Sequence, residues 1–251
     1  MNTKTKNMVL TAVLIALICL LGFTPVGMIP LGFINISILA IPVIIGTVQL
    51  GLKYGLVLGA CFGGISALSA FGIYGTPSTL ASALVAASPV LALIVCFVPR
   101  LLVPVFAHLV YKAATARKAP EQKMEIRPTR AVFGTVIYLA VMFFIVVKLD
   151  AYLLWYVDAA VLASAAGVYL LLFKRRQSAA LAAIAGSLTN TVFYLGLMLI
   201  SYIIMGIDST GILALIGGTG LIAGSAEAIA AAFICTGVCL ALGKNTKKAQ
   251  L

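Results

Sequence analysis

Acidic residues and histidine are scarce in this sequence. Its 251 residues include six aspartates and glutamates and one histidine, and charged residues of both signs make up 9%. A soluble globular domain carries about a quarter charged residues, so this composition is not that of a soluble domain. With His108 as the single histidine, a conventional His-based catalytic centre is not easily built. The chain also lacks a Gly-x-x-x-x-Gly-Lys-Ser/Thr loop, which excludes ATP binding through a phosphate loop.

Cysteines are few, and their number is odd. All five, Cys19, Cys61, Cys96, Cys235 and Cys239, lie in apolar segments, so no disulfide framework is expected. Cys235 and Cys239 are four residues apart and could share a helix face, but no histidine or acidic residue stands beside them. We therefore interpret them as packing residues and expect no metal site.

Long apolar runs dominate what is present. Hydrophobic residues make up 63% of the chain, which indicates a multi-pass membrane protein. The net charge of +11 comes from basic residues in short runs between apolar segments. That distribution is typical of cytoplasmic loops and not of a nucleic-acid surface, so the lipid bilayer is the expected surrounding and no nucleic-acid partner is expected.

The apolar runs predict an all-α polytopic membrane protein with about eight spans and both termini cytoplasmic. Basic residues near the span ends fall on one side, with Lys148 as the exception, and this sets the orientation. Residues 1–113 would hold four spans, 114–130 a basic cytoplasmic loop, 131–177 a two-helix hairpin, and 178–251 the last two spans with a basic tail. The expected spans are about 8–23, 36–50, 54–71, 90–111, 131–147, 157–173, 179–205 and 222–242, with an outer loop over 72–88.

Polar residues inside these spans mark a candidate site. Ser187, Asn190, Thr191 and Tyr194 share one helix face by their spacing. A polar face within a membrane-length helix is costly unless it meets polar partners or a cavity. Two charged residues, Arg100 and Glu227, also fall inside apolar segments, in the middle-to-outer part of the bilayer like the polar face. We therefore expect the three segments to converge on one buried site that opens outward.

Two glycine-containing patterns add to this expectation. Gly55, Gly59 and Gly63 recur at four-residue spacing and predict close packing of their helix against a neighbour. The apolar loop over 24–35 contains two prolines and two glycines that break any helix. We interpret that loop as a lid.

Several stretches together resemble the substrate-binding subunit (S component) of energy-coupling factor (ECF) vitamin transporters, most closely the pantothenate type. They cover residues 1 to about 113 and 178 to 243. Two departures stand out: the hairpin at about 131–173 is extra, and Ala40 stands where the family would have a histidine. The stretches are 22–35 leading into Ile41-Pro-Val-Ile-Ile-Gly46, Gly51-Leu-Lys-Tyr-Gly55, Val98-Pro-Arg-Leu-Leu102, Gly186-Ser-Leu-Thr-Asn-Thr191, and 227–229.

The resemblance implies a six-helix core beside the extra hairpin, an outward-facing vitamin site and a lid from the first loop. It also implies docking to a transmembrane T component that carries two ATPases, which would bind ATP and Mg. This chain would then hold no cofactor and would not be an enzyme. Docking in the family uses an Ala-x-x-x-Ala motif, which Ala12 and Ala16 match. Small residues one turn apart allow close helix approach. The implied location is the plasma membrane of a prokaryote.

The site residues have two interpretations each. Arg100 can bind a substrate carboxylate through its planar fork, or pair with Glu227, because an unpaired charge at this depth is expensive. Asn190 can bind a substrate amide, or join helices. Ser187, Thr191 and Tyr194 would add hydroxyls, and Thr24, Phe33 and Asn35 would come from the lid.

A small anion with amide and hydroxyl groups, such as pantothenate, fits this set. The alternatives are an S component for another vitamin such as folate or riboflavin, a stand-alone secondary transporter, or, with least support, an intramembrane enzyme.

Overall fold

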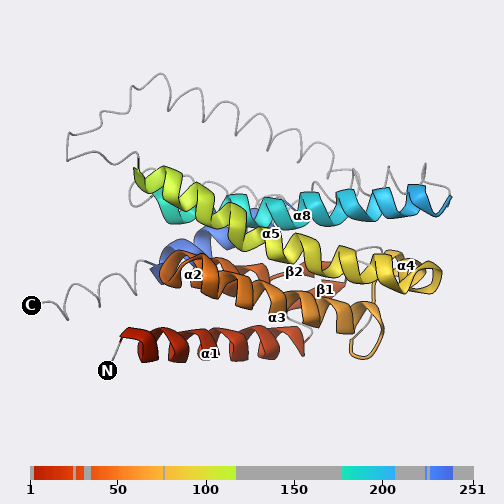
Figure 1. Ribbon diagram of the computed structural model, residues 1–251, viewed down its shortest axis with the longest axis horizontal. Helices are drawn as coiled ribbons and strands as arrows, with labels where there is room; N and C mark the ends of the chain where they lie inside the picture. Colours follow the sequence, from red (N-terminus) through yellow and green to blue (C-terminus); the bar gives the residue numbers. More distant parts are fainter. Residues whose placement is uncertain are drawn as a thin grey trace, which may run out of the picture.

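The computed structural model describes residues 3–24, 27–30, 35–75, 77–116, 177–206, 224 and 227–239. These residues are helical apart from one short β hairpin and the turns between elements. The elements are α1 (Thr3–Gly22), β1 (Met28–Pro30), β2 (Asn35–Ser37), α2 (Ala40–Leu50), α3 (Leu52–Ala70), α4 (Thr79–Ala87), α5 (Pro89–Ala116) and α8 (Gln177–Ile204). A final helix over Glu227–Cys239, blue in Figure 1, is called the last helix below.

Within the described residues, four helices are long and apolar enough to cross a membrane, so the chain is a multi-pass membrane protein. They are Lys4–Gly22, Leu52–Ala70, Pro89–Thr115 and Ser178–Ile204, with shorter apolar helices at Ala40–Leu50 and Glu227–Cys239. These six match six of the predicted spans. The predicted hairpin at 131–177, apart from Gln177, lies outside the described residues, as do the loop residues 117–130 and the tail after 239. The count of eight spans therefore stays a prediction.

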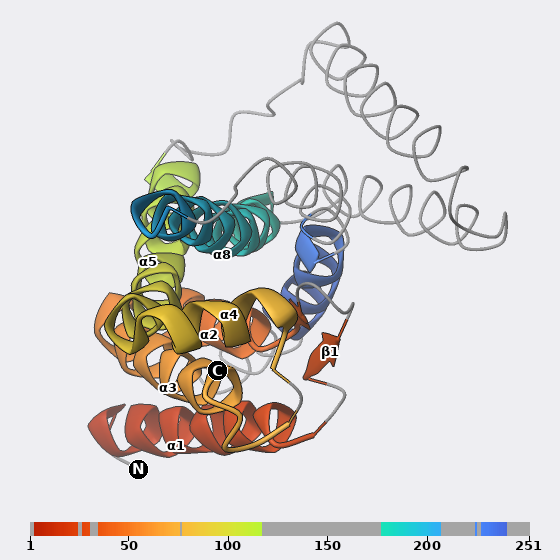
Figure 2. The ribbon, with the colours of Figure 1, turned by 90° about the vertical axis from the view of Figure 1, so that its right-hand side faces the viewer.

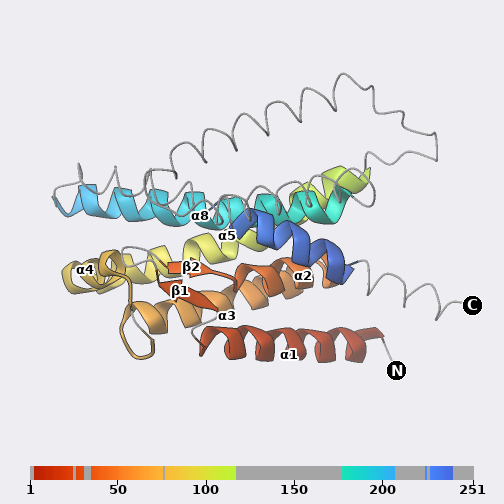
Figure 3. The ribbon, with the colours of Figure 1, turned by 180° about the vertical axis from the view of Figure 1, so that it is seen from behind.

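The helices run roughly alongside one another in a bundle. α5 and α8 lie side by side, α3 lies between α5 and α1, and α1 forms an edge of the bundle (Figures 1 and 2). Fully buried side chains from α1, α2, α3 and α5, such as Ile18, Ile44, Phe62 and Val103, fill the centre. The β hairpin and the last helix lie on the same side of the bundle (Figure 3).

The glycine stripe of α3 packs closely against α5, as its spacing predicted. A Cβ at Gly59 would stand 2.7 Å from the main-chain carbonyl oxygen of Arg100, which is closer than real Cβ atoms approach. Only glycine therefore lets α3 come this near to α5. Gly63 faces Phe97 of the same helix, and Gly55 faces both Thr47 of α2 and Pro104 of α5.

The predicted loop over 24–35 contains a short antiparallel hairpin. Met28 pairs with Ser37 and Pro30 pairs with Asn35. At the end of the hairpin away from its tip, the Ile38 N–H donates to the Gly27 carbonyl at 3.1 Å. Residues 31–34 at its tip lie outside the described residues. This β hairpin is the one departure of the described chain from the all-α prediction.

The predicted outer loop over 72–88 contains helix α4. Ser78 caps its start, with the side-chain oxygen accepting a hydrogen bond from the Ala81 N–H at 3.3 Å. The start of α4 is also fixed to α8, because the Tyr202 hydroxyl donates to the Leu80 carbonyl at 2.8 Å. α4 lies at the end of the bundle opposite the start of α1 (Figure 1).

Candidate functional site

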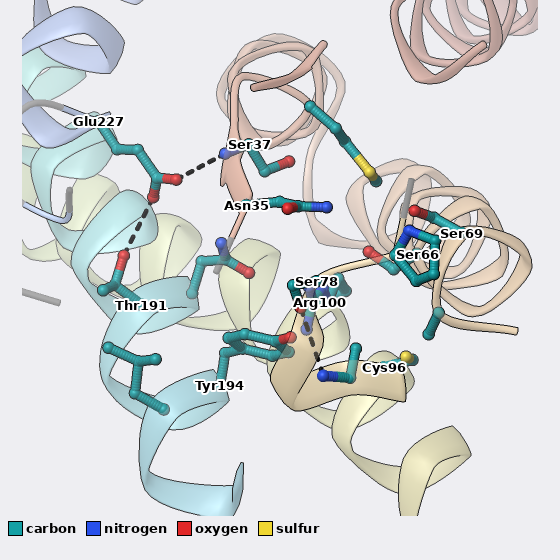
Figure 4. A pocket seen from close by; sticks show the side chains of 16 residues that line it. Asn35, Ser37, Ser66, Ser69, Ser78, Cys96, Arg100, Thr191, Tyr194 and Glu227 are labelled. Carbon is teal, nitrogen blue, oxygen red and sulfur yellow. Dashed lines mark hydrogen bonds between the residues drawn. The ribbon is translucent and has the colours of Figure 1, made fainter. Parts of the chain in front are cut away.

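One open pocket lies where α3, α4, α5, α8, the β hairpin and the start of the last helix meet. Its empty space, counting the mouth, is about 660 Å³. Polar side chains reach it from every one of these elements (Figure 4). The polar and charged lining residues are Asn35, Ser37, Ser66, Ser69, Ser78, Arg100, Asn190, Thr191, Tyr194 and Glu227.

Arg100 owes its position to the proline before it. Pro99 lies inside α5 and has no N–H, so it cannot donate the usual helical hydrogen bond to the Val95 carbonyl. The Arg100 Nη1 donates to that carbonyl instead, at 3.0 Å. Pro99 thus leaves the Val95 carbonyl without its helical donor, and the Arg100 side chain supplies a donor in its place. This hydrogen bond holds the guanidinium back toward the start of α5.

Two aromatic rings hold the Arg100 guanidinium from the sides. Its central carbon lies 4.4 Å from the centre of the Tyr194 ring and 5.3 Å from that of Phe62. Cation–π contacts of this kind are attractive, most of all where water is excluded, and Arg100 is only 6% exposed. Its Nε is buried and has no hydrogen-bond partner among the described residues. A buried cation that lines the pocket therefore keeps one donor unpaired in the described structure.

Glu227 does not pair with Arg100, which corrects one of the two interpretations of these charges. Its Oε1 accepts from the Ser37 N–H at 2.6 Å, and its Oε2 accepts from the Thr191 hydroxyl at 3.0 Å. Glu227 is the single acidic residue among those described. Within this part of the chain, no carboxylate contacts Arg100 directly, although Glu227 lines the same pocket and attracts it through space.

Three of the four predicted polar residues of α8 reach the pocket. Asn190, Thr191 and Tyr194 line it, and Asn190 Oδ1 is a buried acceptor with no partner in the described structure. Ser187 does not line it, although it shares their face and is 1% exposed. The pocket begins one turn further along α8 than Ser187, and helix spacing alone cannot show where along a face a cavity starts.

The three predicted lid residues have different outcomes. Asn35 lines the pocket from β2, whereas Thr24 does not, because its hydroxyl donates to the Leu21 carbonyl at 3.1 Å at the end of α1. Phe33 lies outside the described residues. Beside Thr24, the Phe23 ring meets the Tyr74 ring edge-on at 4.8 Å. Burial raises the pKa of the Tyr74 phenol above its usual value.

The serines of α3 form a wall that the sequence reading missed. Ser66 and Ser69 line the pocket opposite Glu227 and Thr191 (Figure 4), and the Ser66 Oγ is buried without a partner among the described residues. They follow Phe62 on one face of α3, at spacings of four and three residues. That spacing was a usable signal, since it repeats the pattern of α8. Ser78 also lines the pocket, and it could have been recognised as a helix cap.

The arrangement is suited to holding a molecule by hydrogen bonds. The open groups are a donor on Arg100, an acceptor on Asn190, and hydroxyls on Ser37 and Ser66 that can do either. No group of three or more His, Cys, Asp or Glu residues that could bind a metal occurs within the described ranges. A ligand that matches this set must present both acceptors and donors.

Neither a scan against models of protein families nor a search of the curated proteins finds a match for this chain. Its function is therefore argued from the geometry of the pocket.

Proposed function

We propose that this chain is the substrate-capture subunit of an ECF-type vitamin importer and that it binds a small carboxylate, pantothenate, in the pocket beside Arg100. It would deliver the vitamin by docking to a T component with two ATPases in the plasma membrane of a prokaryote. The pocket supports the binding step. The resemblance of the sequence to S components supports the rest.

The observation that carries the proposal is the uncompensated cation. A charge buried away from water is expensive unless an opposite charge or several hydrogen bonds compensate it. Arg100 has two aromatic rings and one main-chain carbonyl around it, but no carboxylate in direct contact among the described residues. An anionic ligand would supply the missing charge and would accept from the open Nε.

The other open groups match the remainder of pantothenate. That molecule has a carboxylate, an amide and two hydroxyls, so it offers a donor to Asn190 Oδ1 and both donors and acceptors to the hydroxyls of Ser37 and Ser66. A neutral or cationic vitamin would leave Arg100 without compensation. The aromatic side chain on the pocket wall is Tyr194, and it already stacks on the guanidinium, which leaves little for the stacking of a flavin or pterin ring.

The position of the pocket fits capture from outside. The start of α1, the start of α3 and the end of α5 lie at one end of the bundle (Figure 1), and their sequences carry Lys4, Lys6, Lys53 and Lys112. Lysines near span ends favour the cytoplasmic side. The pocket is lined from α4 and the residues before it, at the opposite end.

The purified chain alone is expected to bind pantothenate and not to accumulate it. Titration calorimetry against a panel of water-soluble vitamins measures the first part, and uptake into vesicles that contain only this chain measures the second. Adding the T component and ATPases should make uptake depend on ATP.

Two results would contradict this proposal in different ways. Concentrative uptake driven by an ion gradient in vesicles of the chain alone would identify a stand-alone secondary transporter. Tight binding of a neutral or cationic vitamin, with pantothenate silent, would overturn the substrate and leave the capture role standing.

Trp at Ala12 or at Ala16 is expected to block assembly with the T component and to leave pantothenate binding intact. Both alanines are exposed on the outer face of α1, among exposed apolar residues such as Val9, Val13 and Leu20. A bulky ring there would not disturb the core but would prevent close approach of another helix. Co-purification of the complex measures assembly. Ala60→Trp, at an exposed alanine of α3, is the control, and a complex that stays intact in the α1 variants would show that the docking face is elsewhere.

A further inference from the structure

The pocket has hydrogen-bond donors on one side and acceptors on the other. The donor side, built by α3, α4 and α5, comprises Ser66, Ser69, Ser78 and Arg100. The acceptor side, built by α8 and the start of the last helix, comprises Asn190, Thr191 and Glu227. Figure 4 shows Glu227 and Thr191 across the pocket from Ser66 and Ser69. A bound molecule would therefore meet different chemistry at its two ends.

The contacts of Arg100 place its charge on the donor side. The guanidinium carbon lies 5.3 Å from the centre of the Phe62 ring, and Ser66 follows Phe62 by one turn on the same face of α3. The same carbon lies 4.4 Å from the centre of the Tyr194 ring, whose phenol lies beside Ser78. The Ser66 Oγ has no partner among the described residues, and a hydroxyl can donate to an anion. A ligand carboxylate at the Arg100 Nε would thus meet serine hydroxyls as further donors.

The acceptor side carries the negative charge of Glu227. Its Oε1 accepts from the Ser37 N–H at 2.6 Å, and its Oε2 accepts from the Thr191 hydroxyl at 3.0 Å. These bonds hold the carboxylate in place without cancelling its charge. A carboxylate can accept about four hydrogen bonds, so it can accept more from a ligand. Asn190, next to Thr191 on α8, adds a buried Oδ1 that has no partner in the described structure.

From this separation we propose that the pocket binds its ligand in one direction and that Glu227 determines its specificity for single anions. The ligand carboxylate lies against Arg100, and the hydroxyl or amide donors of its other end meet Glu227 and Asn190. A second negative charge at that end would face the Glu227 carboxylate, and like charges placed together cost affinity. The inference rests on the proposed function and narrows it to monocarboxylates with a neutral, donor-bearing far end. Dicarboxylates and phosphate esters are excluded.

The matched acids 6-hydroxyhexanoate and adipate test this specificity without pantothenate. They share one carbon chain and differ in whether the far end is a hydroxyl or a second carboxylate. At matched ionic strength, the hydroxy acid is expected to raise the unfolding temperature of the wild type at a concentration about tenfold lower than adipate requires, because binding to the native state stabilises it. Equal effects of the two acids, or no stabilisation by the hydroxy acid, would overturn the inference.

Two substitutions separate the charge of Glu227 from its shape. Glu227→Gln keeps the length and an acceptor oxygen but removes the charge, so the preference for the hydroxy acid should fall to about threefold or less, mainly because adipate binds better. Glu227→Asp keeps the charge and should keep the preference, while the shorter side chain weakens the binding of both acids. A preference that persists in Glu227→Gln and is lost in Glu227→Asp would show that shape decides, and the inference would be wrong.

Ser66→Ala tests the direction of binding from the other side. Because Ser66 lies on the donor side, loss of its hydroxyl should weaken both acids by the same factor and leave the preference unchanged. Thr189→Val is the control and should change neither acid, since the Thr189 hydroxyl donates to the Ala185 carbonyl of its own helix at 2.6 Å. A preference that Ser66→Ala alters and Glu227→Gln does not would show that the ligand binds in the opposite direction.

Calorimetry with pantothenate and with the phosphate ester of its primary hydroxyl separates this inference from the proposed function. The wild type is expected to bind the ester about tenfold more weakly than pantothenate or worse, and Glu227→Gln should reduce the difference. Equal affinity for the two would overturn the inference and leave the proposed function standing. If the wild type binds neither, while 6-hydroxyhexanoate and adipate still differ as expected, the proposed substrate is wrong and the specificity for single anions stands.

Discussion

Arg100→Ala is expected to weaken pantothenate binding by more than tenfold and to change the affinity for its neutral amide analogue much less. Removing one partner of a buried charged contact costs about 2–5 kcal/mol, and every 1.4 kcal/mol corresponds to about tenfold in affinity. Calorimetry with the two ligands on the wild type and the variant measures this coupling. The neutral analogue is the control, because it keeps the rest of the ligand and removes the charge.

The aromatic contacts of Arg100 make this experiment interpretable. Tyr194 and Phe62 hold the guanidinium in place before a ligand arrives, so the cation is preorganised and little ordering is required on binding. Equal losses for the anion and for the neutral analogue would mean that Arg100 supports the shape of the pocket and does not contact the ligand carboxylate.

Gly59→Ala is expected to destabilise the protein and to weaken ligand binding at the same time. The new Cβ would stand 2.7 Å from the Arg100 main-chain oxygen, and backbone cannot give way as the end of a flexible side chain can. Overpacking of this kind costs about 1–3 kcal/mol. Because the displaced segment of α5 carries Arg100, the pocket should lose affinity for pantothenate as well. Thermal unfolding and calorimetry of the purified variant measure the two effects.

Gly64→Ala is the matched control for this substitution. Gly64 lies on the same helix, and a Cβ there would meet nothing within 4 Å. Alanine is favoured over glycine inside a helix by roughly 0.5–1 kcal/mol, so this variant should be as stable as the wild type or more so. If the two variants behaved alike in both assays, the close approach of α3 to α5 would not be the reason that glycine stands at position 59.

The sequence predicted the parts of the fold that depend on local pattern. Apolar runs located α1, α3, α5 and α8 to within a few residues at most ends, because burial in lipid requires long uninterrupted apolar helices. It also predicted that α8, Arg100 and Glu227 would meet, since polar groups in a membrane gather around one another or around a cavity. Both are properties that a single stretch of chain reveals by itself.

What the sequence could not show depends on which neighbour each group meets. Either of two partners was open to Arg100, and the outcome followed from a carbonyl that Pro99 leaves without its usual hydrogen bond. Ser66 and Ser69 were overlooked although their spacing repeats the pattern of α8, because a single serine in an apolar helix often bonds to its own backbone. The β hairpin was expected only as a lid loop, since its strands have three residues each and show no alternating pattern long enough to recognise.

The proline before Arg100 bears on how such a pocket could be redesigned. An arginine placed by itself into the same turn of another membrane helix would find every carbonyl already bonded and would extend toward whatever water or headgroup its length could reach. Transfer of this buried arginine to another helical scaffold therefore requires both adjacent residues, Pro99 and Arg100. By the same reasoning, a library that randomises Arg100 to change the charge of the bound ligand should randomise Pro99 with it. Pro99 leaves the Val95 carbonyl without a helical hydrogen bond, and the guanidinium is the group that donates to that carbonyl.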